Sequence, residues 1–264
     1  MSEVTDHFTL DIIAPALDGF QAPEGAFEPT GEWSHRYGMY TLTGNPARVG
    51  SVCMGRQPRG DDKCLVTVAY EKLVPGEYRQ RVSAEAACRT DLLCSPREWR
   101  WSFWTEDKDG NVLENSALDN RGEDKGDHVM VYADDLPRRV PAKPPRTINW
   151  CLFDVVQRLP REPFDPIAFT LLDHFDQMKQ KHTLSYHGGV EVILGRKKVQ
   201  EQHEVQLEKG RIRKTRWAQE GGAPARLHGY SDVGWASVPW VYWVNETGRL
   251  LFAVGGLEAY ILEA

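Results

Sequence analysis

The sequence predicts a mostly β fold in which a curved antiparallel sheet, a half-barrel or open barrel, wraps around one or two helices. From about residue 37, short segments rich in β-branched and aromatic residues alternate with turn clusters. One amphipathic helical pattern, near 148–159, interrupts them. No regular alternation of strands and helices occurs, and this favours antiparallel pairing over a parallel sheet.

The composition indicates an ordered globular protein. The 264 residues are 41% hydrophobic and 27% charged, close to globular averages. Residues 1–35, rich in Pro, Gly and acidic side chains, are expected to form an N-terminal arm, and residues 36–264 a single β-rich domain. The net charge of −6, with both signs interspersed, excludes the basic surface of a nucleic-acid-binding protein.

The chain shows no membrane span and no export signal. It has no apolar run of about 18 residues, and residues 1–20 are interrupted by acidic residues and a proline. Five cysteines without CxxC spacing argue against a zinc ribbon and favour a reducing compartment, the cytoplasm. An exported form with its signal removed stays open, as do hairpin disulfides between Cys53 and Cys64 or between Cys88 and Cys94.

The first half of the domain is typical of a β meander. Strands are expected near 40–42, 49–54, 64–70 and 78–86. The clearest hairpin joins 99–104 to 112–117 through an acidic turn that ends in Asp109-Gly110. That turn lacks the spacing of an EF-hand, so calcium is not expected there. Residues 136–145 contain four prolines and are interpreted as a connector, because proline removes a donor from a sheet.

The helix near 148–159 is carried by one apolar stripe and ends before a proline. Its members recur at helical spacing: Ile148, Cys151, Leu152, Val155, Val156 and Leu159. Asp165-Pro166 resembles a helix start, so a second helix is expected over 166–179, with an extended reading of 167–175 as the alternative.

The last third returns to strands. They are expected over 183–186, 190–194, 199–207, 211–217, 240–244, 250–254 and 259–262. The basic segment 211–216 is interpreted as a solvated sheet face. Residues 228–240 are polar, glycine-rich and aromatic, and they are interpreted as a long loop at the mouth of a site.

No short catalytic or nucleotide-binding motif occurs, and no metal site or cofactor is predicted. Six ionisable side chains do lie close together in the sequence: Asp173, His174, Asp176, His182, His187 and His203. On a regular strand, His182 and His187 point to opposite faces, so the sequence does not bring these groups onto one surface.

Nine tryptophans are the unusual feature of the chain. Along an extended strand, Trp101 and Trp104 lie on opposite faces, and Trp240 and Tyr242 share one face. One aromatic row is expected to fill the core and another to line a concave surface, where flat rings with a polar edge suit apolar ligands or sugars. The candidate ligand-binding residues are Trp101, Trp104, Tyr230, Trp235, Trp240 and Tyr242.

The C-terminal aromatic hairpin, 239–251 followed by 259–262, resembles the closing hairpin of DUF3108-like proteins, which are related in shape to the LolA and LolB half-barrels. The resemblance covers about the last hundred residues. It implies a concave antiparallel sheet that holds the helix 148–159 and a non-catalytic role in binding an apolar molecule. It carries over no catalytic residue.

Two functions from different classes follow. The first is a non-enzymatic protein that holds an apolar or lipid-like small molecule between sheet and helix, in a cavity of a few hundred Å³ walled by aromatics. The alternative is a carbohydrate-active hydrolase or lyase, which needs ionisable groups to converge beside exposed tryptophans. Its candidate groups are Asp173, His174, Asp176, His182, His187, His228 and Asp232. A role in binding protein partners and the oligomeric state stay open.

Overall fold

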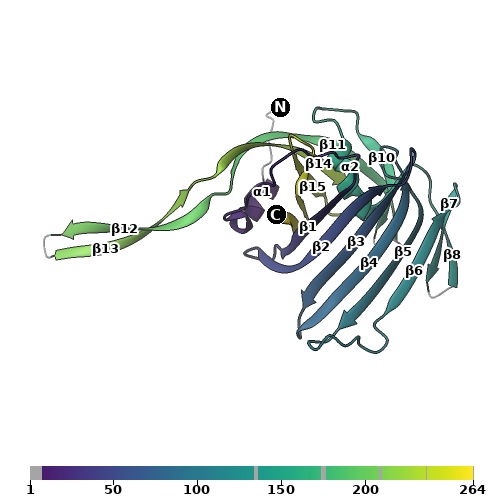
Figure 1. The fold of residues 1–264 in the computed structure, drawn as a ribbon, viewed down its shortest axis with the longest axis horizontal. Helices are drawn as coiled ribbons and strands as arrows, with labels where there is room; N and C mark the ends of the chain where they lie inside the picture. Colours follow the sequence, from purple (N-terminus) through teal and green to yellow (C-terminus); the bar gives the residue numbers. More distant parts are fainter. Residues whose placement is uncertain (1–7, 134–135, 174–176, 208–209, 236, 264) are drawn as a thin grey trace.

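The protein is a curved β-sheet wound around a short buried helix (Figure 1). The computed structural model describes residues 8–133, 136–173, 177–207, 210–235 and 237–263. In this part of the chain, fifteen strands form one sheet, and its edges, β8 and β9, are not paired with each other. The predicted curved, unclosed sheet around helices is therefore confirmed.

The N-terminal half is an antiparallel meander, as predicted. Its strands, in the order in which they pair, are β1 (Trp33–Thr41), β2 (Ala47–Pro58), β3 (Lys63–Val74), β4 (Tyr78–Arg89), β5 (Pro96–Glu106), β6 (Leu118–Asp124), β7 (His128–Ala133) and β8 (Leu136–Pro141). The prediction of a strand over 112–117 is wrong. Only Val112 makes a bridge, to Glu106, and regular pairing resumes at Leu118, because the turn around Asp107 is longer than a tight hairpin.

The proline-rich connector was also misassigned in part. Residues 136–141 form β8, which pairs with β7. Its two prolines are tolerated because β8 is an edge strand, where one row of backbone groups needs no partner.

The C-terminal half completes the sheet. Its members are β9 (Arg146–Ile148), β10 (Ile167–Asp173), β11 (Gln177–Leu194), β14 (Ala223–Val233), β15 (Trp240–Asn245), β16 (Leu250–Gly255) and β17 (Glu258–Glu263). β17 pairs with β1, so one sheet runs through both halves. β9 and β10 are parallel, an exception to the expected antiparallel order, because the helical crossover between them returns the chain in the same direction.

Two further expectations for this half are wrong. The second helix expected over 166–179 is not found in the described part of this range: residues 167–173 belong to β10 and residues 177–179 to β11, which is the extended alternative. The loop expected over 228–240 is shorter, because residues 228–232 pair with both β11 and β15 as part of β14, Val233 pairs with β11, and Trp240 already belongs to β15.

β12 (Lys197–Leu207) and β13 (Gly210–Glu220) form a separate two-stranded sheet. Figure 1 shows this hairpin projecting from the body of the protein as a continuation of β11 and β14. The basic segment 211–216 lies in β13, and its side chains fall outside the described residues.

The predicted helix 148–159 is confirmed in position and is shorter at both ends. A 3-10 turn, η2 (Asn149–Cys151), leads into α2 (Leu152–Arg158). Trp150 and Phe153 lie off the predicted apolar stripe, yet both are buried with the rest of the helix. The six residues from Leu152 to Gln157 are all buried, because α2 lies within the curve of the sheet.

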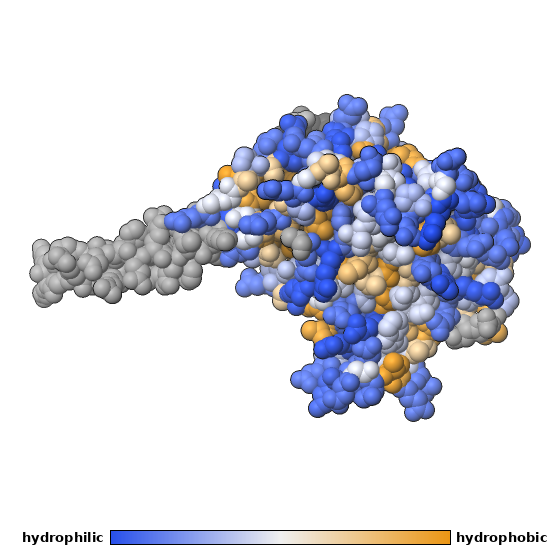
Figure 2. All heavy atoms as spheres, viewed as in Figure 1, coloured by the Kyte–Doolittle hydropathy of each residue, from blue (hydrophilic) through white to orange (hydrophobic). Residues whose placement is uncertain are grey.

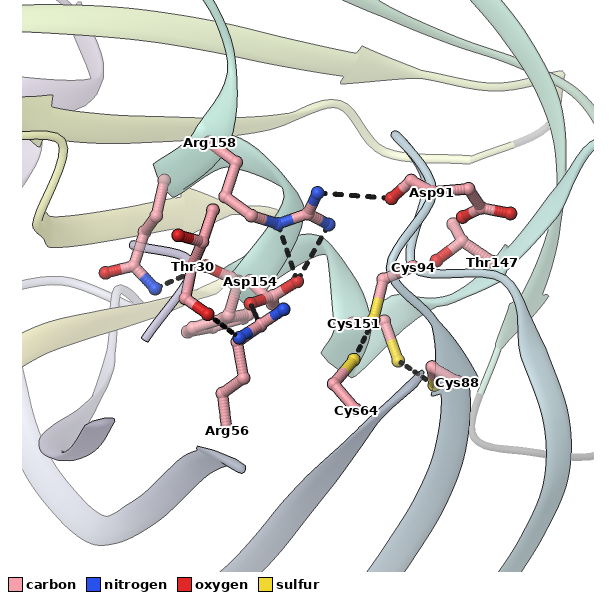
Figure 3. A network of polar contacts seen from close by, with 12 residues as sticks. Thr30, Arg56, Cys64, Cys88, Asp91, Cys94, Thr147, Cys151, Asp154 and Arg158 are labelled. Atoms are coloured by element: carbon pink, nitrogen blue, oxygen red, sulfur yellow. Dashed lines mark hydrogen bonds and ion pairs between the residues drawn. The ribbon is translucent and has the colours of Figure 1, made fainter. Parts of the chain in front are cut away.

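A buried ion triad fixes α2 to the sheet. Arg56 Nε lies 3.0 Å from Asp154 Oδ1, and Arg158 Nη2 lies 2.8 Å from Asp154 Oδ2. Arg56 also donates to the carbonyl oxygens of Thr30 and Gly31, and Arg158 to that of Asp91. Figure 3 shows the triad beside a group of cysteines. Its three charges are therefore paired and hydrogen-bonded, as burial requires.

The N-terminal segment covers the outer face of the C-terminal strands. It contains α1 (Phe8–Ile13) and η1 (Ala14–Leu17). Trp243 Nε1 donates to Thr9 Oγ1 at 3.0 Å, and the ring of Phe20 packs on that of Phe252. Large side chains gather in the interior, whereas the face in Figure 2 is mostly hydrophilic with small, separate hydrophobic areas. No helix among the described residues is both long and apolar enough to cross a membrane.

Candidate functional site

A cavity of about 220 Å³ lies between the buried helix and the C-terminal strands. Five aromatic side chains form its wall: Trp150, Phe153, Trp240, Tyr242 and Tyr260. Phe153 meets Tyr242 and Tyr260 edge to face, with centroids 5.8 and 5.6 Å apart. Trp240 is tilted by 30° to Tyr260, with centroids 5.7 Å apart. The rings thus form one continuous apolar surface.

Strand alternation explains why the aromatic rings converge. Trp240 and Tyr242 are two residues apart on β15 and project to the same face. Tyr242 pairs with Ala253, which pairs with Tyr260, so a small residue separates two large ones. Trp240 lies over Gly255, where a Cβ atom would come within 2.3 Å of the indole. Gly255 is therefore required for the indole to lie flat on the sheet.

Polar side chains gather on another side of the same cavity. They are Asp173, Lys179, His182, Asp232, Ser237 and Glu258. Their charges are largely paired: Lys179 Nζ lies 2.6 Å from Asp173 Oδ2, and Glu258 pairs with Lys72. The cavity is thus amphipathic, apolar on the side of α2 and β15 and polar on the side of β10, β11 and β14.

His182 is the centre of a hydrogen-bond chain. Its Nδ1 lies 2.7 Å from Asp232 Oδ1, and its Nε2 lies 3.3 Å from Ser237 Oγ. His182 and Asp232 are buried, whereas Ser237 is partly exposed. A Cβ atom at Gly234 would come within 2.2 Å of His182 Nε2, so the loop 234–239 depends on glycine to close over the imidazole. The three groups follow the order carboxylate, imidazole, hydroxyl of a Ser-His-Asp triad, in which the carboxylate orients the imidazole and the imidazole accepts the proton of the hydroxyl nucleophile.

A β-bulge brings Lys179 and His182 to the same cavity. The two residues are three apart, which on a regular strand would place them on opposite faces. Between the pairs Phe169–His182 and Leu171–Lys179, β11 has one more residue than β10. Lys181, in this bulge, has φ +60°. Bulges re-aim side chains in this way, often beside functional sites.

The tyrosines of the wall are neutral hydrogen-bonding groups. Burial, with the nearby carboxylate of Asp232, raises the pKa of Tyr242 well above its usual value. Burial, with Glu258, raises the pKa of Tyr260 in the same way, and its hydroxyl lies 3.3 Å from Glu258 Oε2. Neither phenol ionises at neutral pH, so the wall adds no charge to the cavity.

The cavity brings together only two of the six predicted ligand-binding residues, Trp240 and Tyr242. Tyr230 is fully buried elsewhere, and its hydroxyl donates to the carbonyl oxygens of Leu159 and Pro160. Trp235 is 78% exposed, with Lys181 Nζ 5.4 Å from its ring. Trp104 Nε1 donates to Glu106 Oε1 at 2.8 Å.

Trp101 lines a different hollow, of about 390 Å³, across β4, β5 and β6. A neighbouring hollow of about 360 Å³ has Trp99 in its wall. Their charged rims are occupied by pairs such as Arg100 with Glu85, and Arg121 lies over the ring of Tyr132. Each of these hollows has two aromatic rings in its wall, whereas the cavity beside α2 has five.

The ionisable cluster converges in part. Asp173, His182 and Asp232 meet at the cavity, whereas His187 packs against Trp243 and His228 bonds to Tyr186. His174 and Asp176 lie outside the described residues, as does the side chain of His203. Sequence reasoning missed Ser237, Lys179, Trp150 and Phe153. Trp150 and Phe153 could have been recognised from the sequence, because they add large apolar side chains to the helix outside its predicted apolar stripe.

The described structure has free cysteines only. Cys53 is exposed on β2, whereas Cys64 is buried, so the disulfide considered between them is not formed. Cys64 lies beside Cys94, and Cys88 beside Cys151, the latter two 63 positions apart in the sequence.

No protein-family model and no curated protein matches this sequence. Among solved structures, the chain is similar to a β-barrel-like protein of domain of unknown function DUF1849 from Brucella abortus, with a TM-score of 0.47 and 6% identity. The alignment covers 89% of this chain and 96% of that one. This similarity does not support DUF3108-like, LolA or LolB proteins specifically, and no family model matches them to this chain.

Proposed function

We propose that the protein binds a small amphipathic molecule in the cavity beside α2, with its flat apolar part on the aromatic wall and its polar end at His182 and Ser237. One observation carries the proposal: a single cavity joins five aromatic rings to a cluster of hydrogen-bonding groups. Sites for small molecules have this composition, mainly apolar with a few polar groups that fix orientation.

The size and charge of the cavity narrow the ligand class. Its volume of about 220 Å³ lies below the roughly 300–1,000 Å³ of sites for drug-sized ligands. Its lysine and two of its carboxylates are paired, and the third carboxylate, Asp232, is bonded to His182. We therefore expect a small uncharged ligand with hydroxyl or carbonyl groups, rather than an ion.

One side chain in the wall of the cavity is both apolar and exposed. Val238 is 62% exposed, and Trp235, three residues earlier in the chain, is 78% exposed. Exposed apolar side chains beside a cavity favour capture of a ligand with an apolar part.

Native mass spectrometry of the purified protein, followed by organic extraction, tests the proposal. We expect a co-purifying small molecule, and we expect its removal to shift the tryptophan fluorescence. Trp240→Ala should abolish retention, whereas Trp104→Ala, whose indole bonds to Glu106 outside the cavity, should retain it. If no molecule co-purifies, a thermal-shift screen of small uncharged aromatic alcohols and ketones takes the place of the extraction experiment. The absence of a co-purifying molecule together with the absence of any thermal shift would refute binding.

A second candidate function, acyl-group hydrolysis, rests on the chain Asp232–His182–Ser237. Ser237 Oγ would attack a carbonyl carbon while its proton passes to His182 Nε2, and Asp232 would stabilise the imidazolium. The backbone N–H of Ser237 is engaged with the carbonyl oxygen of Gly234, at 3.3 Å, so it does not point to an oxyanion. This difference places binding ahead of catalysis.

A fluorophosphonate probe distinguishes the two functions. A reactive Ser237 forms an oxygen–phosphorus bond, fluoride leaves, and the serine proton passes to His182. Catalysis predicts one label per chain that Ser237→Ala removes. Ser231→Ala is the matched control, because its hydroxyl bonds to Ser185 and not to His182. Without labelling of the wild-type protein, the hydrolase function is refuted and binding is unaffected.

A further inference from the structure

Four buried cysteines converge from four places in the chain. Cys64 on β3 lies directly opposite Cys88 on β4, Cys94 lies in the connection from β4 to β5, and Cys151 lies in η2. All four are 0–1% exposed. Figure 3 shows their sulfur atoms turned toward one another between the sheet and the helix.

The sulfur atoms of Cys88, Cys94 and Cys151 have the spacing of ligands around one ion, and that of Cys64 lies next to Cys94. Cys88 Sγ and Cys151 Sγ are 3.7 Å apart, and Cys64 Sγ and Cys94 Sγ are 3.8 Å apart. The three sulfur atoms of Cys88, Cys94 and Cys151 all lie within 4.8 Å of one another. Tetrahedral zinc with Zn–S bonds of about 2.3 Å separates its sulfur ligands by about 3.8 Å. A disulfide instead needs sulfur atoms about 2.05 Å apart.

Cys94 is the hub of the group. It lies beside Cys64, Cys88 and Cys151, so no assignment of two disulfide pairs accounts for all its contacts. Its backbone has φ +49°, an unusual value for a residue with a side chain. The turn is held by the N–H of Cys94 on the carbonyl of Asp91 and by the N–H of Ser95 on Asp91 Oδ1. The strained turn directs the thiol inward. Strained backbone of this kind is often found at functional positions.

The neighbouring ion triad offsets part of the charge of such a site. Arg56 and Arg158 carry two positive charges against the one negative charge of Asp154, so the triad has a net charge of +1. A divalent ion held by four thiolates has a net charge of −2. Cys94 interacts with both Asp154 and Arg158. The two buried groups together therefore have a net charge of −1, smaller than that of the metal site alone, which reduces the cost of burying the site.

We propose that Cys88, Cys94 and Cys151 bind one Zn²⁺ as thiolates, with Cys64, beside Cys94, as the fourth ligand. Thiolate sulfur is a preferred ligand of zinc, and a closed set of cysteines without an open position is typical of a structural site. Each ligating thiol releases its proton to solvent on binding, and no redox step is involved. The ion would join the β3–β4 hairpin to η2, where Cys151 lies 63 positions beyond Cys88.

Metal analysis of the full-length protein, purified without chelator, tests this site. We expect about one zinc per chain by elemental mass spectrometry. After chelation under reducing conditions, Co²⁺ added to the wild-type protein should give visible d–d bands of a tetrahedral complex and a thiolate-to-cobalt band in the near ultraviolet. The cobalt spectrum needs no variant, so it decides the question even where a cysteine substitution prevents folding.

Variants assign the ligands. Cys151→Ser should lose the zinc, and Cys53→Ser is the matched control, because Cys53 is exposed on β2 and outside the cluster. A thiol count on the denatured protein separates the alternatives. Five free thiols with no retained zinc and no cobalt spectrum would overturn the site, and so would a single free thiol, which indicates two disulfides. Neither result bears on the aromatic cavity.

Discussion

Replacing Asp154 by asparagine tests whether the buried ion triad holds α2 in the sheet. The substitution keeps the shape of the side chain and removes its charge. Arg56 and Arg158, whose side chains are 3% and 9% exposed, then lose their counterion. Removing one partner of a buried ion pair in this way costs about 3–5 kcal/mol, because the remaining charge stays desolvated.

Thermal and urea unfolding, followed by circular dichroism, measure this loss. For a chain of this size, 1 kcal/mol corresponds to about 2 °C, so Asp154→Asn should lower Tm by about 6–10 °C. Arg100→Ala is the control: it breaks an ion pair with Glu85 at 2.8 Å whose side chains are 74% and 44% exposed, and such pairs contribute less than about 1 kcal/mol. Equal stability of the two variants would refute the role of the triad.

Three more perturbations probe the sheet and the site. Gly255→Ala places a methyl group 2.3 Å from Trp240, so we expect a changed near-ultraviolet dichroism spectrum and a loss of about 1–3 kcal/mol; unchanged values would contradict the packing. His35 has its pKa lowered by burial to about 4, so the native state binds fewer protons than the unfolded state. The stability that the neutral His35 side chain contributes to the folded state is fully present above about pH 6.5 and is lost as the pH falls through about 4. Before solvent screening it amounts to about 3 kcal/mol, and to about half of that at this partly exposed site. Urea unfolding at pH 7 and pH 4 should show a smaller difference in His35→Gln than in the wild type, and equal differences would contradict the assignment. Tyr230→Phe leaves the carbonyl groups of 159–160 without its hydroxyl and should cost about 1–2 kcal/mol in urea unfolding, whereas no loss would mean that water replaces the hydroxyl.

The sequence predicted the sheet well because strand signals are local. Alternation and turn residues fixed most strands of the meander and the final three strands, and the helical stripe located α2. The prediction of a second helix failed because the apolar run is short. In such a run, the spacing of Leu171, Leu172 and Met178 fits a helix and an extended strand equally well. Pairing of β10 with β9 and β11, a tertiary effect, decided between them.

The candidate site was predictable only in part, for a geometric reason. Trp240 and Tyr242 share a face by simple alternation, so their common position in the wall of one cavity was foreseeable. The bulge at Lys181, which puts Lys179 and His182 in one cavity, shifts the register by a residue and has no reliable sequence signal. The partner of His182, Asp232, lies fifty positions away on β14, and only strand pairing brings them together.

The short segment 150–154 connects all three buried sites. Trp150 and Phe153 face the aromatic cavity, whereas Cys151 and Asp154 face the cysteines and the ion triad. Residues three apart on a helix share a face. The side chains that face the cavity therefore alternate with those that face the cysteines and the triad along about one turn and a half of backbone. Because the segment is buried on every side, it cannot shift toward one site without disturbing the others. The cysteine group and the triad therefore support the segment that carries Trp150 and Phe153, and the shape of the cavity depends on residues outside its wall.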